Sequence, residues 1–359
     1  METFVCSTRV VSGEGALQIL GQQNCRRLLI VTETAMARDD WVRQTAKASQ
    51  ASETECFDDV DAVPTMQQAV TGSRMIKEYR PDLVVALGGR NVLDCGKAMA
   101  CFSGITCRLA AVPAAYGIGS EVTDGVLLSH NGRRHFLRKE TMMPELAVLD
   151  SRLVGKLPAA RVAEAGFEML SCALECYAYG GGSLSCLHAR EGFSAVWASL
   201  PAAFAGNGAA RHRLQNASVL TGMARNQKEP GLCSALENSL GIAFGLSRGK
   251  LAAILMPAII GCNAHAAGSR YAQLARAAGL GGSREEIGVR NLRMGLIRLR
   301  RELGLPGTLV QAGVDIRRIW NSSRQVVEMT LEDPSCRNNP VAVDGFLVRR
   351  ILEEITGRI

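Results

Sequence analysis

The residues best placed to do chemistry lie in a glycine turn, Gly88-Gly89-Arg90-Asn91, which is followed by Asp94 and Lys97. The turn comes directly after an apolar run and opens a segment with helical spacing. In a turn of this kind, backbone N–H groups and the N-terminus of a helix hold a phosphate group. The same turn also occurs in α/β connections that bind nothing, so by itself it leaves both interpretations open.

The elements that must position this turn are short apolar runs separated by segments with helical spacing. The runs cover residues 27–32, 82–89, 108–113 and 146–150. Apolar runs without polar alternation are typical of a parallel sheet that is buried on both faces. One segment differs, because Asn131-Gly132 stands between two short runs and predicts an antiparallel hairpin.

After Pro158 the strand patterns stop, and Ala- and Leu-rich segments with helical spacing continue to the end of the sequence. In one of these segments Glu168, Cys172 and Glu175 share a face opposite an apolar stripe. A length of 359 residues suits about two domains. We therefore expect an α/β dinucleotide-binding (Rossmann-like) domain over residues 1–155 and an all-helical domain over residues 156–359.

Composition and charge exclude several classes of protein. With 47% apolar and 21% charged residues, the chain is neither disordered nor a small disulfide-stapled scaffold. No window approaches the 18 or more uncharged apolar residues that a membrane span requires, so we expect no membrane partner. The net charge of +7 comes from scattered arginines rather than a basic tract, which argues against nucleic acid and suits a nucleotide-sized anion.

The cysteines and the first residues indicate a cellular compartment. Twelve cysteines are present without any Cys-x-x-Cys, and most lie in apolar runs, so we expect buried, reduced thiols. The start of the sequence shows no basic segment followed by an apolar one, and hence no secretory signal. Both features predict a cytoplasmic protein.

Six motifs follow one another along the whole chain, at residues 88–97, 111–123, 143–150, 157–161, 165–175 and 338–340. In this order they resemble the iron-containing alcohol dehydrogenase family. Within the family, the chain is most similar to the propanol and ethanol dehydrogenases associated with bacterial microcompartments. The resemblance implies a dehydroquinate synthase-like fold and an ancestral NAD(P)-dependent interconversion of a short-chain aldehyde and its alcohol.

The resemblance also assigns the cofactor-binding residues, and some of them depart from the family pattern. The family turn Gly-Gly-Gly-Ser is changed at Arg90 and Asn91, and a family Thr-Thr pair is replaced by Ala114-Ala115. Arg90 either obstructs the approach of a pyrophosphate or folds over it as a bidentate donor. We expect weakened binding of NAD(H) or NADP(H) by Glu33, Gly88, Gly89, Arg90, Asn91, Asp94, Lys97, Gly117, Gly119, Ser120 and Arg134.

The family's four metal ligands, one Asp and three His, match Glu168, Cys172, Ser234 and Arg248. A further active-site His matches Asn238. Because Arg248 places a permanent cation at the site, we expect no iron or zinc and an ion pair between Glu168 and Arg248. The alternative is a rearranged zinc site built from Glu168, Cys172, Cys233 and Glu237.

Three functional hypotheses follow. The first is an inactive homologue kept as a structural or binding subunit, either a homodimer or a hetero-oligomer with an active paralogue. Its location would be the cytoplasm, within or attached to a microcompartment whose components are further partners. The second is a metal-independent oxidoreductase in which Arg248 polarises the carbonyl. The third is a protein that binds another phosphate-bearing ligand through Arg90, Arg134 and Arg248.

Overall fold

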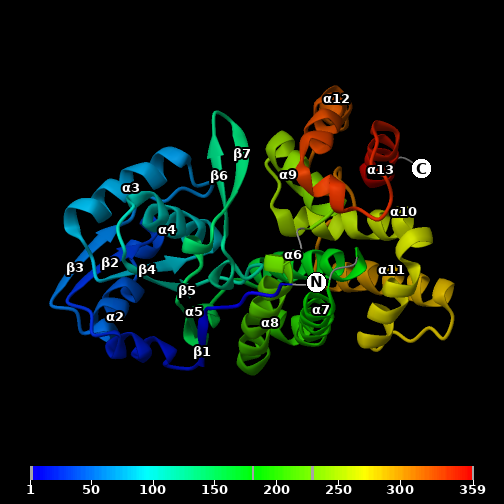
Figure 1. The fold of residues 1–359 in the computed structure, drawn as a ribbon. Helices are drawn as coiled ribbons and strands as arrows, with labels where there is room; N and C mark the ends of the chain where they lie inside the picture. The colour runs from blue at the N-terminus through cyan, green and yellow to red at the C-terminus, as the bar shows by residue number, and fades with distance from the viewer. Residues whose placement is uncertain (1–2, 180–181, 228–229, 358–359) are drawn as a thin grey trace. The chain divides into compact units, whose positions relative to one another are not determined.

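A computed structural model describes residues 3–179, 182–227 and 230–357, which divide into two compact units (Figure 1). Residues 5–157 form an α/β unit, and the chain from Pro158 onward forms a helical unit. The division falls two residues after the expected end of the first domain. Phe4 belongs to the helical unit, where its ring stacks on His188 with 5.0 Å between ring centroids.

The α/β unit contains a six-stranded parallel sheet with the strand order β1-β8-β5-β4-β2-β3. The four predicted runs are confirmed as β2 (Arg27–Val31), β4 (Leu83–Gly88), β5 (Arg108–Pro113) and β8 (Leu146–Asp150). The two edge strands, β1 (Arg9–Gly13) and β3 (Glu53–Phe57), were not predicted, because neither is a continuous apolar run. Gly88 pairs with Pro113, so the segments that follow β4 and β5 leave the sheet side by side.

Helices cover both faces of this sheet and explain its apolar strands. Leu28 and Ile30 of β2 pack in one hydrophobic cluster with η1 (Ala16–Gln23) and α2 (Asp40–Ser49). Leu29 and Val31 pack in another, with α3 (Met66–Tyr79) and α4 (Arg90–Ser103). The remaining short helices are α1 (Thr34–Ala37), η2 (Ser120–Val122), η3 (Glu140–Met142) and α5 (Ser151–Val154).

The predicted hairpin is confirmed as β6 (Gly125–His130) and β7 (Arg133–Arg138), which pair antiparallel. At its tip Asn131 has a φ of 50° and Gly132 a φ of 72°. Two consecutive residues with positive φ define the tight turn that Asn-Gly favours.

The helical unit consists of α6 (Ala159–Ala178), α7 (Ser183–Phe204), α8 (Gly208–Gln227), α9 (Leu232–Phe244), α10 (Arg248–Ala277), α11 (Glu285–Glu302), α12 (Ile316–Glu332), η4 (Pro334–Asn338) and α13 (Gly345–Thr356). No strand occurs among its described residues, as predicted. Helix α6 packs against α7, α8, α9 and α10. Its expected polar face is therefore also buried, with Cys172 3% exposed and Glu175 fully buried.

The expectation that no apolar window approaches the length of a membrane span is wrong for helix α10. Residues 251–269 contain no Asp, Glu, Lys or Arg, and this helix is long and apolar enough to cross a membrane by composition alone. However, 72% of its most apolar window is buried inside the protein. A central helix packed on several sides needs the same composition, and α10 has that position in the helical unit.

The twelve cysteines are all free, as predicted. Burial is less general than expected. Only Cys25, Cys95, Cys172, Cys176 and Cys233 are buried, and Cys56 is exposed on β3.

Candidate functional site

The glycine turn has the predicted strand–turn–helix geometry, with β4 ending at Gly88 and α4 beginning at Arg90. A Cβ atom on Gly88 would lie 2.7 Å from Cγ2 of Val92, and one on Gly96 would lie 2.8 Å from Cβ of Ala86. These two glycines therefore allow α4 to pack closely on β4. Their presence is explained by packing, whether or not a ligand binds.

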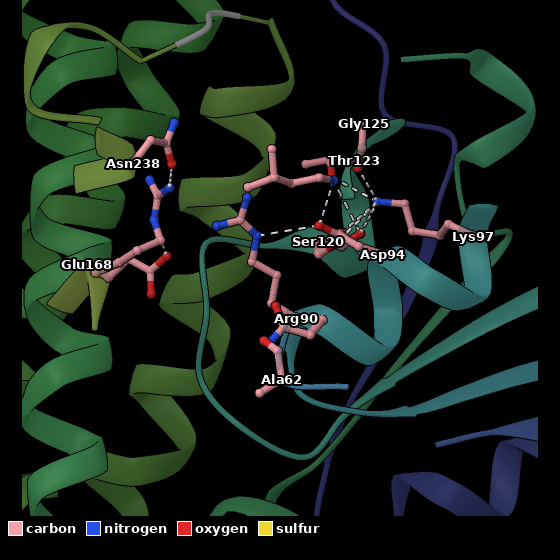
Figure 2. Close-up of polar contacts among 12 residues, drawn as sticks. Ala62, Arg90, Asp94, Lys97, Ser120, Thr123, Gly125, Glu168 and Asn238 are labelled. Carbon is pink, nitrogen blue, oxygen red and sulfur yellow. Dashed lines mark hydrogen bonds and ion pairs between the residues drawn. The ribbon is translucent and has the colours of Figure 1, made fainter. Parts of the chain in front are cut away.

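Lys97 is the centre of a buried polar cluster at this end of the sheet (Figure 2). Its Nζ donates hydrogen bonds to the backbone carbonyls of Ser120 at 3.0 Å and Gly125 at 2.7 Å. It also contacts the hydroxyls of Ser120 at 3.1 Å and Thr123 at 3.3 Å. The side chain is fully buried, so Lys97 ties α4 to the segment between β5 and β6.

Asp94 joins the same cluster. Its carboxylate accepts hydrogen bonds from the Ser120 hydroxyl and from the N–H of Leu127, the latter at 3.0 Å. It also lies 3.8 Å from Nζ of Lys97 and 3.6 Å from Nε of Arg90. Two cations of α4 thus share one carboxylate, and the Arg90 side chain is only 14% exposed.

Three other predicted cofactor residues, Asn91, Gly117 and Gly119, lie near the glycine turn. The amide of Asn91 donates to the carbonyl of Ala62. Gly119 has a φ of 73°, which favours glycine, and a Cβ on Gly117 would lie 3.9 Å from Cβ of Arg90.

Two predicted cofactor residues lie on other elements of the α/β unit. Glu33 is half-buried at the start of α1, and its backbone bridges to Asp59. Arg134 is half-buried on β7, opposite Ser129. Cofactor contacts by these residues stay predictions.

In the helical unit, Arg248 is the first residue of α10, and each of its three guanidinium nitrogens has a partner. Nε lies 3.1 Å from Oε1 of Glu168, and Nη2 lies 2.8 Å from Oε2 of Glu237. Nη1 donates to Oδ1 of Asn238 at 2.6 Å. The predicted ion pair with Glu168 is confirmed, whereas the second carboxylate partner, Glu237, was not predicted.

These contacts connect several helices of the unit, and Figure 2 includes Glu168 and Asn238 among them. The second oxygen of Glu237 accepts from the Ser171 hydroxyl at 2.9 Å and contacts the Cys233 thiol at 3.7 Å. Asn238 donates to Asp333 at 2.9 Å. The Arg248 cluster therefore joins α6, α9 and α10 to the residue that precedes η4.

Burial and charge act against each other in the Arg248 cluster. Burial raises the pKa of Glu237 to about 7, Arg248 lowers it in part, and Glu168 raises it further. Burial lowers the pKa of the Arg248 guanidinium, but Glu237 and Glu168 more than offset this, so its pKa stays above the usual range. Arg248 therefore stays charged, and its own charge is balanced inside the cluster.

A second buried acid, Glu175, was given no role by the sequence. Its carboxylate accepts from the N–H groups of Cys233 at 2.7 Å and Ser234 at 3.2 Å, and from the Ser234 hydroxyl at 2.8 Å. Tyr179 donates to it at 3.0 Å. Burial raises the pKa of Glu175, and these hydrogen bonds lower it in part. Ser234 thus helps to bind a carboxylate that holds the N-terminus of α9.

The residues at the predicted ligand positions do not fit a metal ion. They offer a carboxylate, a thiol, a hydroxyl and a guanidinium, and a guanidinium has no lone pair to donate and repels a cation. Throughout the described ranges, no group of three or more His, Cys, Asp or Glu side chains is placed to hold a metal. The alternative zinc site receives no support, because Glu168 and Glu237 both bind Arg248.

Comparisons with known proteins cover nearly the whole chain. The family "Iron-containing alcohol dehydrogenase" matches residues 7–151, and "Fe-containing alcohol dehydrogenase family, C-terminal" matches residues 162–356. The 1-propanol dehydrogenase PduQ of Citrobacter freundii is 30% identical over 372 residues, covering 99% of this chain and 100% of that protein.

A more distant sequence relative and a solved structure also match nearly the whole chain. The NADPH-dependent butanol dehydrogenase of Clostridium saccharobutylicum is 23% identical, covering 98% of this chain and 97% of that protein. The structure of an iron-containing alcohol dehydrogenase from Thermococcus thioreducens has a TM-score of 0.91 at 24% identity, covering 99% of this chain and 100% of that one. The predicted fold class is confirmed.

Proposed function

Because the chain belongs to the iron-containing alcohol dehydrogenase family, we propose that it is a divergent member whose metal-dependent interconversion of an aldehyde and its alcohol has been lost. It would serve instead as a structural or binding subunit. The observation that carries this proposal is the Arg248 guanidinium, held by Glu168, Glu237 and Asn238 in place of a metal ligand.

The Arg248 cluster is also the reason to rank a metal-independent oxidoreductase second. A metal ion in such a site polarises the substrate oxygen as a Lewis acid. Arg248 carries a positive charge, but each of its nitrogens already has a partner inside the protein. Two carboxylates offset the charge of its guanidinium, so any N–H that it still offered to a carbonyl would polarise that carbonyl less than a metal ion does.

The glycine turn is the feature that favours the second candidate, a metal-independent oxidoreductase. It keeps a strand–turn–helix at the carboxyl end of β4, the place where open parallel sheets bind dinucleotides. A nicotinamide nucleotide held there by residues 88–90 and the start of α4 would supply a hydride. A solved sulfoacetaldehyde reductase from Bifidobacterium kashiwanohense, 20% identical with a TM-score of 0.88, holds NAD+.

The third hypothesis, a different phosphate-bearing ligand, has less support. The Arg90 side chain lies 3.6 Å from the Asp94 carboxylate and is mostly buried. The Arg248 guanidinium binds two carboxylates. Neither arginine is therefore presented to an anion as an uncompensated charge.

The resemblance to microcompartment-associated propanol dehydrogenases supports a proposal about location. We place the protein in the cytoplasm, within or attached to a bacterial microcompartment. Localisation of a fluorescent fusion, with and without expression of the compartment shell, tests this proposal separately from activity.

The test of the proposed function combines metal analysis, cofactor titration and an activity assay on the purified full chain. We expect no stoichiometric iron or zinc, no calorimetric binding of NAD(H) or NADP(H) at millimolar concentration, and no reduction of propionaldehyde. The Citrobacter freundii PduQ enzyme, prepared identically, is the positive control.

Each of the other results would overturn the proposal in a distinct way. Nucleotide binding and aldehyde reduction without metal would favour the second candidate. Stoichiometric iron or zinc would show that the Arg248 cluster rearranges to admit a metal. A matched variant, E168D/C172H/S234H/R248H, rebuilds the family's ligand types. Metal uptake by this variant alone would attribute the loss of the site to these four positions.

A further inference from the structure

The two parts of the chain differ in charge. Residues 1–157 contain 18 basic and 18 acidic side chains, whereas residues 158–359 contain 23 basic and 16 acidic ones. The whole net charge of +7 therefore belongs to the helical part. Because the excess is on one part only, the helical unit of one molecule is attracted to any acidic surface on the other part of a second molecule.

The exposed face of α11 concentrates this positive charge. Arg290, Met294, Arg298 and Arg301 are all exposed, and at 100° per residue they fall within about 80° of one another around the helix. We call them the α11 stripe. Its three arginines form no ion pair with the described residues, unlike Arg293 on the same helix, which pairs with Glu354. Met294 is 52% exposed and puts an apolar contact among these charges.

The acidic counterpart is the segment of residues 53–61 in the α/β unit. Five of its nine residues are acidic and none is basic, namely Glu53, Glu55, Asp58, Asp59 and Asp61. All five are exposed. Only Glu53 has an ion pair among the residues described, with Arg26 at 3.3 Å on the open surface. Val63, 43% exposed, follows the segment and offers an apolar neighbour.

The acidic segment lies at an edge of the sheet, where a partner protein can reach it. It begins with β3, the edge strand of the sheet, which pairs with β2 on one side only. An edge strand presents unpaired backbone groups, and acidic side chains on it also discourage pairing with another strand. An α-helix with basic side chains satisfies the charges without requiring strand pairing.

We infer that the α11 stripe of one copy of this chain docks on the 53–61 segment of a second copy. The two surfaces match in charge and in length. Arg290 to Arg301 spans roughly 16 Å of helix, and the first part of the segment, Glu53 to Asp58, spans roughly 16 Å of extended chain. The contact joins different surfaces of the two copies, so repeating it builds a closed ring or an open filament.

The first experiment measures assembly of the full chain against salt by sedimentation velocity. Charge screening shortens from about 10 Å at 0.1 M salt to about 3 Å at 1 M, so we expect a larger species at low salt that disappears at high salt. The absence of any salt-sensitive species would overturn the proposal.

The decisive experiment exchanges the charges. Each of the variants E55K/D58K and R290E/R298E should lose the low-salt species, with association weakened about tenfold or more. An equimolar mixture of the two should associate again. The intact α11 stripe of E55K/D58K matches the intact segment 53–61 of R290E/R298E, and the two reversed surfaces match each other. A mixture that stays dissociated, or single variants that assemble like the wild type, would refute the contact.

Matched controls separate this contact from general charge effects. R317E/R324E makes the same charge change as R290E/R298E on α12, and E14K/E140K makes the same change as E55K/D58K in the α/β unit. Both should assemble like the wild type, and circular dichroism checks that every variant is folded. The proposal stands apart from the proposed function, since aldehyde reduction and cofactor titration are read independently of assembly.

Discussion

Two cations, the fully buried Lys97 of the α/β unit and the mostly buried Arg248 of the helical unit, show opposite ways of satisfying a positive charge. Lys97 in the α/β unit is held mainly by neutral oxygens of Ser120, Thr123 and Gly125. Arg248 in the helical unit is held by the carboxylates of Glu168 and Glu237.

The difference shows how strongly the stability of each unit depends on the charge of its cation. At Lys97, two cations share the single carboxylate of Asp94, so the surrounding carbonyls carry much of the interaction. At Arg248, two carboxylates share a single cation, so removing the cation leaves buried negative charge without compensation. The helical unit is therefore the more sensitive of the two to loss of its cation.

The largest expected effect on stability is that of R248A, which directly tests whether the helical unit depends on its cation. With the buried carboxylate of Glu237 and the mostly buried carboxylate of Glu168 left unpaired, the free energy of unfolding should fall by about 3–5 kcal/mol. Urea denaturation followed by circular dichroism measures it. The control R324A removes an arginine whose side chain is 90% exposed and should cost less than about 1 kcal/mol. A loss at R248A no greater than at R324A would contradict the assigned role.

The counterpart in the α/β unit is K97M, which keeps the side-chain length and removes the charge. The carbonyls of Ser120 and Gly125 lose their donor, so the unfolding free energy should fall by about 2–4 kcal/mol. Hydrogen exchange should increase first in the segment between β5 and β6. The exposed Lys77 provides the control K77M, which should leave both readings unchanged. Faster exchange confined to α9 and α10 would contradict this prediction.

The pH dependence of stability tests the Arg248 cluster without removing its cation. Because burial raises the pKa of Glu237 from 4.5 to about 7, the folded protein holds this proton more tightly than the unfolded chain. This contribution to stability is full below pH 4.5 and is lost as the pH rises through 7, by up to about 3 kcal/mol. E237Q should flatten the stability profile over that range, whereas E328Q, on the surface of α12, should leave it unchanged. An unaltered slope in E237Q would assign the dependence to another group.

The smallest expected effect is that of S234A, which tests whether Ser234, a predicted ligand position, has a structural role. Removing the hydroxyl deletes the 2.8 Å hydrogen bond to Glu175 and should cost about 1 kcal/mol. The control S194A removes a hydroxyl that bonds only to a carbonyl of its own helix and should cost less. Thermal melting compares the two, and equal melting temperatures would show that Glu175 does not need Ser234.

The sequence predicts the fold well where burial dominates. Continuous apolar runs and the Asn131-Gly132 turn identify four of the six parallel strands and the hairpin. It misses β3, because Glu53 and Glu55 on an exposed edge do not have the signature of a buried strand. Edge strands are stabilised by pairing with a neighbour, and a linear pattern does not contain that neighbour.

At the candidate site, the sequence predicts the Glu168–Arg248 pair and misses Glu237. The first follows from matching two positions to one ancestral site, whereas Glu237 reaches Arg248 only because α9 and α10 pack together. The burial of Glu175 could have been predicted from the sequence. An acid between Leu174 and Cys176, within an apolar helical stretch, is the pattern of a buried carboxylate that needs donors.

The stacking of Phe4 on His188 has a consequence for the covalent path of the chain. Phe4 lies in the helical unit, and the chain enters the α/β unit at Val5 and returns to the helical unit at Pro158, so the α/β unit is tethered at both of its ends. Unfolding of the α/β unit pulls on both α6 and α7, because one tether continues into Pro158 and the other leads to the partner of His188. Mechanical and thermal disturbance of the sheet thus reaches the helical unit at two points instead of one.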